Sequence, residues 1–347
     1  MEKPKVRISV RNLVEFILRS GDLDNSRGSS GDKEAMLKGG RLHRKIQRSM
    51  KGNYQAEVSL KRESEYEDVI IQVEGRADGI FTEDGEFWID EIKGTYGNLQ
   101  AMEVPVPVHR AQAMCYGWIY GEKEGLSQIG IQMTYSHLDT EDTRRFREIF
   151  SMEELKNWYQ KLLDDYHKWI SCSLSWKKER NASMKDLQVP FPYREGQREI
   201  VSGVYHTVSS KKTLFVQAPT GVGKTMSAIF PSVRAIGEGK GETLFYLTAK
   251  TITGTVAWEA FHTLRENGLK FKVTAITAKE KLCFLDSPEC TPEKCPYAKG
   301  HFDRVNDAVY ELWTTEEVYS REVIRAHAEK WQVCPFEMCL DLSVWVD

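Results

Sequence analysis

The feature that most constrains this chain is the octet 218–225, Ala-Pro-Thr-Gly-Val-Gly-Lys-Thr. It follows the apolar run 214–216, which is typical of a buried strand, and precedes 226–230, which favours a helix start. A glycine turn between a strand and a helix N-terminus points backbone N–H groups at a phosphate, and the helix dipole favours its charge. The octet therefore predicts a phosphate-binding loop that holds a nucleotide and Mg²⁺. The expected nucleotide-binding residues are Thr220, Gly221, Val222, Gly223, Lys224 and Thr225.

The composition sets broad limits on the remainder of the chain. At 347 residues with 41% hydrophobic residues, we expect two or three cored domains. The net charge of −3 neither requires nor excludes nucleic acid, because basic patches can be local. The sequence contains no apolar run of about 18 residues, the length that a membrane helix needs, and its N-terminus lacks the apolar core of a signal peptide. We therefore expect no membrane partner and a cytoplasmic location.

The chain divides into three segments. Residues 1–150 mix strand-like and helical patterns, and 151–189 combine a helix over 151–170, capped by Ser151 and Glu154, with a polar linker. Residues 190–347 alternate strands with helical stretches, which is typical of a parallel α/β sheet. Strands are expected there at 213–217, 243–247 and 272–274. In the first segment we expect helices within 9–18, 41–50 and 108–120, a flexible loop at 21–32, strands at 57–61, 69–74 and 129–135, and a hairpin around Gly85.

Two carboxylates and a lysine end the strands of that hairpin. Asp78 closes one strand, and Glu91 and Lys93 close the next. Residues two apart in a strand face the same side, so Glu91 and Lys93 project together and Asp90 faces away. Carboxylates beside a lysine can hold Mg²⁺ and position a water for attack on a phosphodiester. A solvated hairpin with a surface Glu-x-Lys is the plainer alternative.

These residues resemble the motifs of RecB-like nucleases of the PD-(D/E)XK superfamily. Asp78 matches the motif Asp, Glu91 the Asp/Glu and Lys93 the Lys, while Gly40-Arg-Leu-His43 matches an upstream Gly-x-x-His and Gln112-Ala-Met-Cys-Tyr116 a downstream Gln-x-x-x-Tyr. The resemblance covers about residues 39–120. It implies a restriction-endonuclease-like α/β domain in which His43, Asp78 and Glu91 bind Mg²⁺, Lys93 assists the reaction, and Gln112 and Tyr116 support the site and substrate.

The third segment carries further signals. Gln197, upstream of the loop, can contact an adenine edge, which favours ATP, and Thr248 and Lys250 suit either nucleic-acid backbone contacts or ordinary capping and solvation. Five of the seven cysteines gather near the end of the chain: Cys283, Cys290, Cys295, Cys334 and Cys339. A reducing compartment disfavours disulfides, and the clustering favours a metal or cluster site. The spacing lacks the paired Cys-x-x-Cys of zinc ribbons.

Together, the loop, the Leu-Thr-Ala strand end, the cysteine trio and Cys334-Pro-Phe-Glu resemble the XPD/DinG branch of superfamily 2 helicases over about residues 190–347. The resemblance implies a partial RecA-like motor domain that binds ATP and single-stranded DNA and translocates 5′→3′. It also implies a 4Fe-4S cluster in an insert at about 280–340, held by Cys283, Cys290, Cys295 and Cys334, with Cys339 spare. Zinc, or thiols in the core without a metal, are the alternatives.

The motor of that family continues with an Asp-Glu-x-His box and a second motor domain, neither of which this sequence contains. We therefore expect a truncated product with weak ATP hydrolysis, whose full activity needs a missing C-terminal motor domain. The combined hypothesis is a nuclease–helicase fragment for processing or repair of single-stranded or end-containing DNA. The alternatives are a non-catalytic DNA-binding module that binds nucleotide without turnover, and a P-loop kinase.

Overall fold

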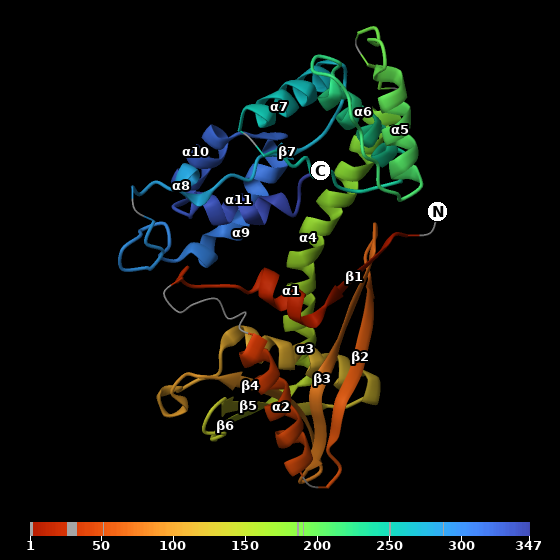
Figure 1. The fold of residues 1–347 in the computed structure, drawn as a ribbon. Coiled ribbons are helices and arrows are strands. Elements are labelled where there is room, and N and C mark those ends of the chain that lie inside the picture. Colours follow the sequence, from red (N-terminus) through yellow and green to blue (C-terminus); the bar gives the residue numbers. More distant parts are fainter. Residues whose placement is uncertain are drawn as a thin grey trace. The chain divides into compact units, whose positions relative to one another are not determined.

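The computed structural model of the protein describes residues 3–25, 33–50, 52–185, 187–189, 191–249, 251–286 and 288–347 (Figure 1). Residues 26–32 of the expected loop and Lys250 lie outside the described residues. The chain is a mixed α/β protein with two compact units. Unit 1 comprises residues 1–171 and 289–303, and unit 2 comprises 172–288 and 304–347. None of the helices in these described ranges is long and apolar enough to cross a membrane.

Unit 1 is built on a six-stranded mixed sheet. Its strands are β1 (Lys5–Ser9), β2 (Gln55–Glu65), β3 (Ile70–Glu83), β4 (Glu86–Thr95), β5 (Gln128–His137) and β6 (Thr143–Ser151). The strand order is β1-β3-β4-β5-β6, with β2 along the other edge of β3. The expected hairpin is confirmed: β3 and β4 pair antiparallel across Asp84 and Gly85, whose φ values of 52° and 87° suit a tight primed turn.

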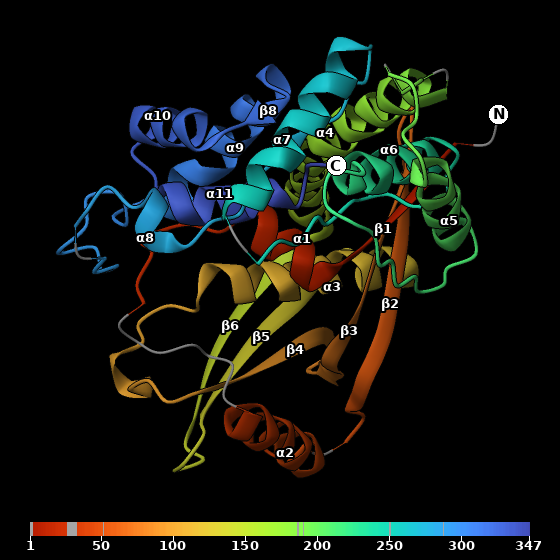
Figure 2. The ribbon, with the colours of Figure 1, turned by 45° about the horizontal axis from the view of Figure 1, so that its top comes forward.

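Helices cover both faces of this sheet (Figure 2). The helices are α1 (Val10–Ile17), α2 (Lys33–Ser49) and α3 (Pro107–Glu124), with the short η1 (Leu99–Ala101) after β4. Proline at the first position starts α3, and Gly125 in the left-handed region ends it. On the opposite face, Ile92 of β4 packs against Leu42 and Ile46 of α2. Neighbouring residues of β4 therefore face different helices, and this alternation places the candidate site.

The helix expected over 151–170 is longer than predicted. The helix α4 spans Met152–Lys185, so the irregular linker expected from Ser171 is wrong as far as Lys185. The predicted cap is confirmed, because the Ser151 N–H donates to Glu154 Oε2 at 2.9 Å and the Glu154 N–H donates to Ser151 Oγ at 3.2 Å. The later turns are held by tertiary contacts such as the buried ion pair of Arg180 with Asp347 at 2.5 Å, which local polarity does not reveal.

Unit 2 is mainly helical. Its helices are α5 (Gln197–Ser209), α6 (Lys224–Gly237), α7 (Thr251–Glu266), α8 (Lys279–Leu282), α9 (His301–Thr315, whose first turn belongs to unit 1), α10 (Arg321–Trp331) and α11 (Pro335–Ser343). Residues of α6 and α7, among them Ile229, Val233 and Leu264, form its core with Phe271. Among the described residues of this unit, the sheet consists of β7 (Val273–Thr274) paired parallel with β8 (Val318–Tyr319).

The strands expected at 213–217 and 243–247 are wrong. Both segments run without strand pairing, and Phe215 and Leu247 are 93% and 88% exposed. An apolar run becomes a strand only where a neighbour satisfies its backbone groups. The backbone of 243–247 is instead held at Leu244, whose N–H donates to Asp347 O at 2.7 Å, while the Asp347 N–H donates to Lys272 O at 3.0 Å. The parallel sheet of a complete motor domain is therefore absent from the described residues.

Candidate functional site

The first candidate site lies at an opening in the sheet of unit 1. One edge of β3 pairs with β1 over residues 70–74 and with β4 over 79–83, while β2 occupies the other edge. On the first edge, residues 75–78 have no strand partner among the described residues. Beyond Asp90, β4 leaves β3 and continues alongside β5. The sheet thus forks beside Asp78, and this fork between β3 and β4 is called the crevice below.

Asp78 joins three elements at this crevice. Its Oδ2 accepts from the Ile92 N–H at 2.7 Å, which ties β3 to the diverging part of β4. Its Oδ1 lies 3.5 Å from His43 Nδ1 on α2. Burial alone would lower the pKa of His43, but the hydrogen bond and charge of Asp78 and the charge of Glu91 outweigh it and raise that pKa. The structure therefore brings the predicted histidine and the first predicted carboxylate together.

Glu91 is the most buried charged group of the site. It is 5% exposed, its Oε1 lies 2.8 Å from Lys93 Nζ, and its Oε2 has no hydrogen-bond partner in the structure. Burial, followed by the negative charge of Asp78, raises the pKa of Glu91 to about 7. A buried carboxylate with one vacant oxygen has capacity for a further positive ligand. Glu91 and Lys93 therefore project together as predicted, but the expectation that Asp78, Glu91 and Lys93 end their strands is wrong, because β3 continues to Glu83 and β4 to Thr95.

Gln112 and Tyr116 approach the crevice from α3. Both are buried, and Gln112 Oε1 has no hydrogen-bond partner in the structure. Burial raises the pKa of Tyr116, and the charge of nearby Glu91 adds to this effect. A Cβ atom on Gly75 would lie 2.7 Å from Tyr116 Oη, so only glycine leaves room for the phenol at the unpaired stretch of β3. Tyr116 therefore lies against this opening, and Gln112 lies one helical turn before it on the same face of α3.

Asp90 faces away from this site, as its strand position predicts. It is fully buried, and its carboxylate accepts from Tyr54 Oη at 3.0 Å, Gln132 Nε2 at 3.0 Å and Thr134 Oγ1 at 2.6 Å. Burial raises the pKa of Asp90, and these hydrogen bonds oppose the rise. Its oxygens are thus occupied by protein donors, in contrast to Oε2 of Glu91.

His109 belongs to the neighbourhood of the site, although no motif pointed to it. It precedes Gln112 and Tyr116 by three and seven residues on α3, so the three share a helix face. Its Nδ1 lies 3.2 Å from Tyr135 Oη, which also accepts from the Val106 N–H at 2.9 Å. A hydroxyl hydrogen that points to Nδ1 would place the ring proton on Nε2. Burial, Lys93 and Arg11 lower the pKa of His109 to about 4, so the ring is neutral.

The donor set suits Mg²⁺ better than a soft metal. Asp78 and Glu91 supply carboxylate oxygens, the ligands that this ion prefers, and Oε2 of Glu91 and Oε1 of Gln112 are buried oxygens without protein partners. Within the described ranges, no three His, Cys, Asp or Glu side chains form a ready-made metal-binding group. One of the two oxygens of Glu91 is engaged by Lys93 in this arrangement.

The predicted phosphate loop forms the second candidate site, in unit 2. Gly223 (φ 81°) precedes α6, which begins at Lys224 as the motif requires. Lys224 Nζ donates to the carbonyl oxygens of Ala218 at 3.0 Å and Pro219 at 2.7 Å. Thr225 Oγ1 lies 3.4 Å from Tyr246 Oη. The helix side of the motif is thus present, but the strand expected before the loop is not, and the lysine lies on the loop's own carbonyls.

Gln197 lies against this loop. It is 2% exposed, its Oε1 accepts from the Arg194 N–H at 3.0 Å, and a Cβ atom on Gly223 would lie 2.8 Å from its Nε2. The guanidinium of Arg194 donates to the carbonyl oxygen of Gly221. The structure therefore places Gln197 beside the glycine turn, where its contacts support the loop.

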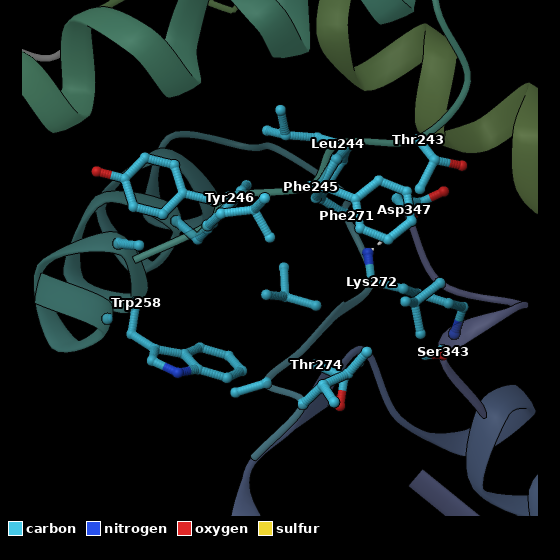
Figure 3. Close-up of a pocket in the computed structure, with 18 of the residues that line it drawn as sticks. Thr243, Leu244, Phe245, Tyr246, Trp258, Phe271, Lys272, Thr274, Ser343 and Asp347 are labelled. Atoms are coloured by element: carbon cyan, nitrogen blue, oxygen red, sulfur yellow. Dashed lines mark hydrogen bonds between the residues drawn. The ribbon is translucent and has the colours of Figure 1, made fainter. Parts of the chain in front are cut away.

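A cavity of about 250 Å³ separates the two extended segments of unit 2 (Figure 3). Residues 243–248 line one side and 271–276 the other, with Tyr246 and Trp258 facing the hollow. The walls are mostly apolar, as expected of segments with the composition of buried strands. The strand predicted at 272–274 is confirmed as β7, which pairs with β8, whereas 243–247 forms no strand beside it.

The four predicted cluster cysteines are divided between the units. Cys283 ends α8 and Cys334 precedes α11, both in unit 2, where burial raises the pKa of Cys334 to about 11. Cys290 and Cys295 belong to unit 1, where the Asn25 N–H donates to Cys290 O at 2.9 Å. Cys339 is buried and hydrogen-bonded near Thr274. The thiols suit an iron–sulfur cluster chemically, but the described residues contain no assembled group of three.

Comparison with known proteins gives little further information. No protein-family model and no curated protein matches the chain. A solved structure titled "Crystal structure of SSO0001" is similar over 47% of this chain and 78% of its own, with 20% sequence identity and a TM-score of 0.30. A similarity of this extent carries no argument about function.

Proposed function

We propose that unit 1 is a Mg²⁺-dependent nuclease that cleaves phosphodiester bonds of DNA. The observation that carries the proposal is the convergence of Asp78, Glu91, Lys93 and His43 on one opening of the sheet, where an oxygen of Glu91 has no partner among the described residues. Charged groups of this kind are costly in a sheet interior unless a ligand compensates for them. A structural role is a better explanation for Asp90, whose oxygens are fully engaged.

Asp78, Glu91 and His43 are the residues that would hold Mg²⁺. Bound Mg²⁺ supplies charge neutralisation and a more acidic water. Lys93, released from Glu91, donates to a non-bridging phosphate oxygen and stabilises the charge that develops when water attacks phosphorus and the bond to the leaving sugar oxygen breaks. Gln112 and Tyr116 restrict where the carboxylates and the substrate lie.

The test is cleavage of single-stranded and end-labelled duplex DNA in MgCl₂ or EDTA. Lys93→Ala is expected to lower the rate by about 10²- to 10³-fold, as loss of one electrostatic donor does, while Lys123→Ala, an exposed lysine near the end of α3, leaves it unchanged. Equal rates for Lys93→Ala and the unaltered protein would refute the proposal. DNA binding that depends on salt, without any Mg²⁺-dependent cleavage, would favour the non-catalytic DNA-binding module.

A second candidate function is ATP binding by residues 218–225 in a partial DNA helicase motor. The glycine turn, the start of α6 at Lys224 and the position of Gln197 support it. Binding of Mg²⁺·ATP would require Lys224 to leave the carbonyls of Ala218 and Pro219. Fluorescent-ATP titration is expected to show saturable binding that Lys224→Ala abolishes and Lys240→Ala retains. Identical binding by both variants would exclude this loop as the site.

The proposal of a partial helicase motor also includes a 4Fe-4S cluster. Cys283, Cys290, Cys295 and Cys334 would hold it. Protein purified without oxygen is then expected to contain about four iron atoms per chain with broad absorbance near 400 nm. Zinc at one ion per chain would identify the alternative metal, and a metal-free protein would place the thiols in the core alone.

A further inference from the structure

A hollow of about 600 Å³ lies where β4 and β5 end in unit 1. Tyr96 lines it three residues after Lys93. The parallel register places Thr95 opposite His137, so Tyr96 and His137 meet at this end of the sheet, with ring centroids 6.4 Å apart and nearly perpendicular planes. Tyr96 is 51% exposed, which leaves much of a planar aromatic ring open to a ligand.

The charges around the hollow balance. Lys38 lies 5.9 Å from the centre of the Tyr96 ring and pairs with Asp139 at 3.1 Å. Of the lining residues, Arg144 donates to the carbonyls of Leu99 and Gln100, and Asp142 accepts from the Thr140 hydroxyl at 2.7 Å. Because each of these charges has a protein partner and their signs cancel, the surroundings of the ring suit a neutral, planar group better than a phosphate.

The helix α2 connects this hollow to the candidate catalytic residues. Lys38 of this helix lies near the ring of Tyr96, and His43 of the same helix lies beside Asp78. Five residues correspond to about 7.5 Å along a helix axis. A group bound at Tyr96 would therefore belong to the next nucleotide or two along a strand whose phosphate lies at Asp78.

We infer that the hollow is a nucleobase subsite of the proposed nuclease, in which Tyr96 stacks on an unpaired base of single-stranded DNA near the scissile phosphate. The inference rests on the proposed nuclease function and names its substrate class. A base within a duplex is covered by its neighbours on both faces, so only an unstacked base reaches the ring. The polar lining then contacts the base edge, and Lys93 and the carboxylates contact the phosphate.

The test compares Tyr96→Leu with Tyr96→Phe in the full chain. Binding of a fluorescent oligothymidylate is measured with CaCl₂ in place of MgCl₂, together with binding of a duplex of equal length. Tyr96→Leu is expected to weaken single-strand binding by about 5- to 150-fold, the effect of one lost base stack. Tyr96→Phe keeps the ring and is expected to bind within about twofold of the unaltered protein. Duplex binding should not change.

A scan with one abasic nucleotide per oligonucleotide makes the test specific. One position is expected to weaken binding by the unaltered protein, and the same position should have no effect on Tyr96→Leu. The inference would be overturned if Tyr96→Leu lost single-strand and duplex binding to the same extent. It would also be overturned if Tyr96→Leu bound single strands as tightly as the unaltered protein. If the positional effect is present but Lys93-dependent cleavage is absent, the proposed reaction fails while the base subsite stands. Thermal unfolding midpoints check that each variant is folded.

Discussion

Glu91→Gln should make the metal-free protein more stable, although it removes a residue of the proposed site. A pKa raised from 4.5 to about 7 means that folding disfavours the ionised carboxylate by about 3 kcal/mol. Glutamine has nearly the same shape and keeps an oxygen for Lys93, but it carries no charge. The expected gain in unfolding free energy at pH 8 is therefore up to about 3 kcal/mol, or about 6–12 °C in the midpoint of a domain of this size.

The pH dependence follows from the sign of the shift. Below the unfolded pKa of 4.5 the carboxylic acid is protonated in both states, so the two proteins should have equal stability. As the pH rises from 4.5 to about 7, the unfolded protein loses this proton first and the unaltered protein loses stability relative to Glu91→Gln. Above pH 7 the difference should be constant. Urea unfolding in EDTA, followed by circular dichroism at pH 5 and pH 8, measures it.

Mg²⁺ should remove most of this difference. A ligand at a hundred times its dissociation constant stabilises the folded state by about 2.7 kcal/mol, so MgCl₂ should raise the midpoint of the unaltered protein and leave Glu91→Gln nearly unchanged. Asp90→Asn, which alters the neighbouring buried carboxylate on the other face, should retain the response to Mg²⁺. The reasoning is refuted if Glu91→Gln is less stable than the unaltered protein in EDTA at pH 8, or if Mg²⁺ stabilises both to the same extent.

Three further substitutions separate structural from functional roles. Asp90→Ala leaves three buried hydrogen-bond donors without an acceptor and should lower the free energy of unfolding by about 3–5 kcal/mol. Asp90→Asn keeps an acceptor and should lower it by about 1 kcal/mol. Equal losses for the two variants in urea unfolding would contradict the hydrogen-bond network. His109→Ala should lower kcat/KM for cleavage about tenfold, and His109→Gln, which keeps a donor near Nε2, should retain more activity; identical losses would mean that the donor has no role. Gly75→Ala forces Tyr116 to move, so it should lower the cleavage rate and reduce the free energy of unfolding by about 1–3 kcal/mol. Unchanged cleavage and stability would show that Tyr116 can move away from the new Cβ atom at little cost.

The parts of unit 1 that sequence predicts are those with local signals. The Asp-Gly turn gives the hairpin, and the alternation of strand residues gives the opposite orientations of Asp90 and Glu91. The parallel pairing of β1 with β3 has no local signal, because partners 65 residues apart meet only through the fold. The crevice depends on that pairing. The sequence therefore predicts which residues belong to the site, but not the unpaired stretch of β3 beside which they lie. His109 was missed for the same reason: only the placement of α3 brings it to Lys93.

Unit 2 shows the opposite case, in which local signals mislead. The runs 214–216 and 245–247 have strand composition, but composition determines a strand only when a neighbour accepts its backbone hydrogen bonds, and most of these residues are exposed. The phosphate loop keeps its shape because its cationic groups bind its own carbonyls, Lys224 at Ala218 and Pro219 and Arg194 at Gly221.

This difference bears on which chemistry the described residues can perform. A nucleotide must first compete with internal hydrogen bonds for Lys224. At the crevice of unit 1 the situation is reversed, because Oε2 of Glu91 and Oε1 of Gln112 have no internal partner to lose. A cation bound there would relieve the repulsion between Glu91 and Asp78 that the raised pKa of Glu91 records. The proposed affinity for a metal and the expected stability of Glu91→Gln therefore follow from the same electrostatic cost and form one prediction.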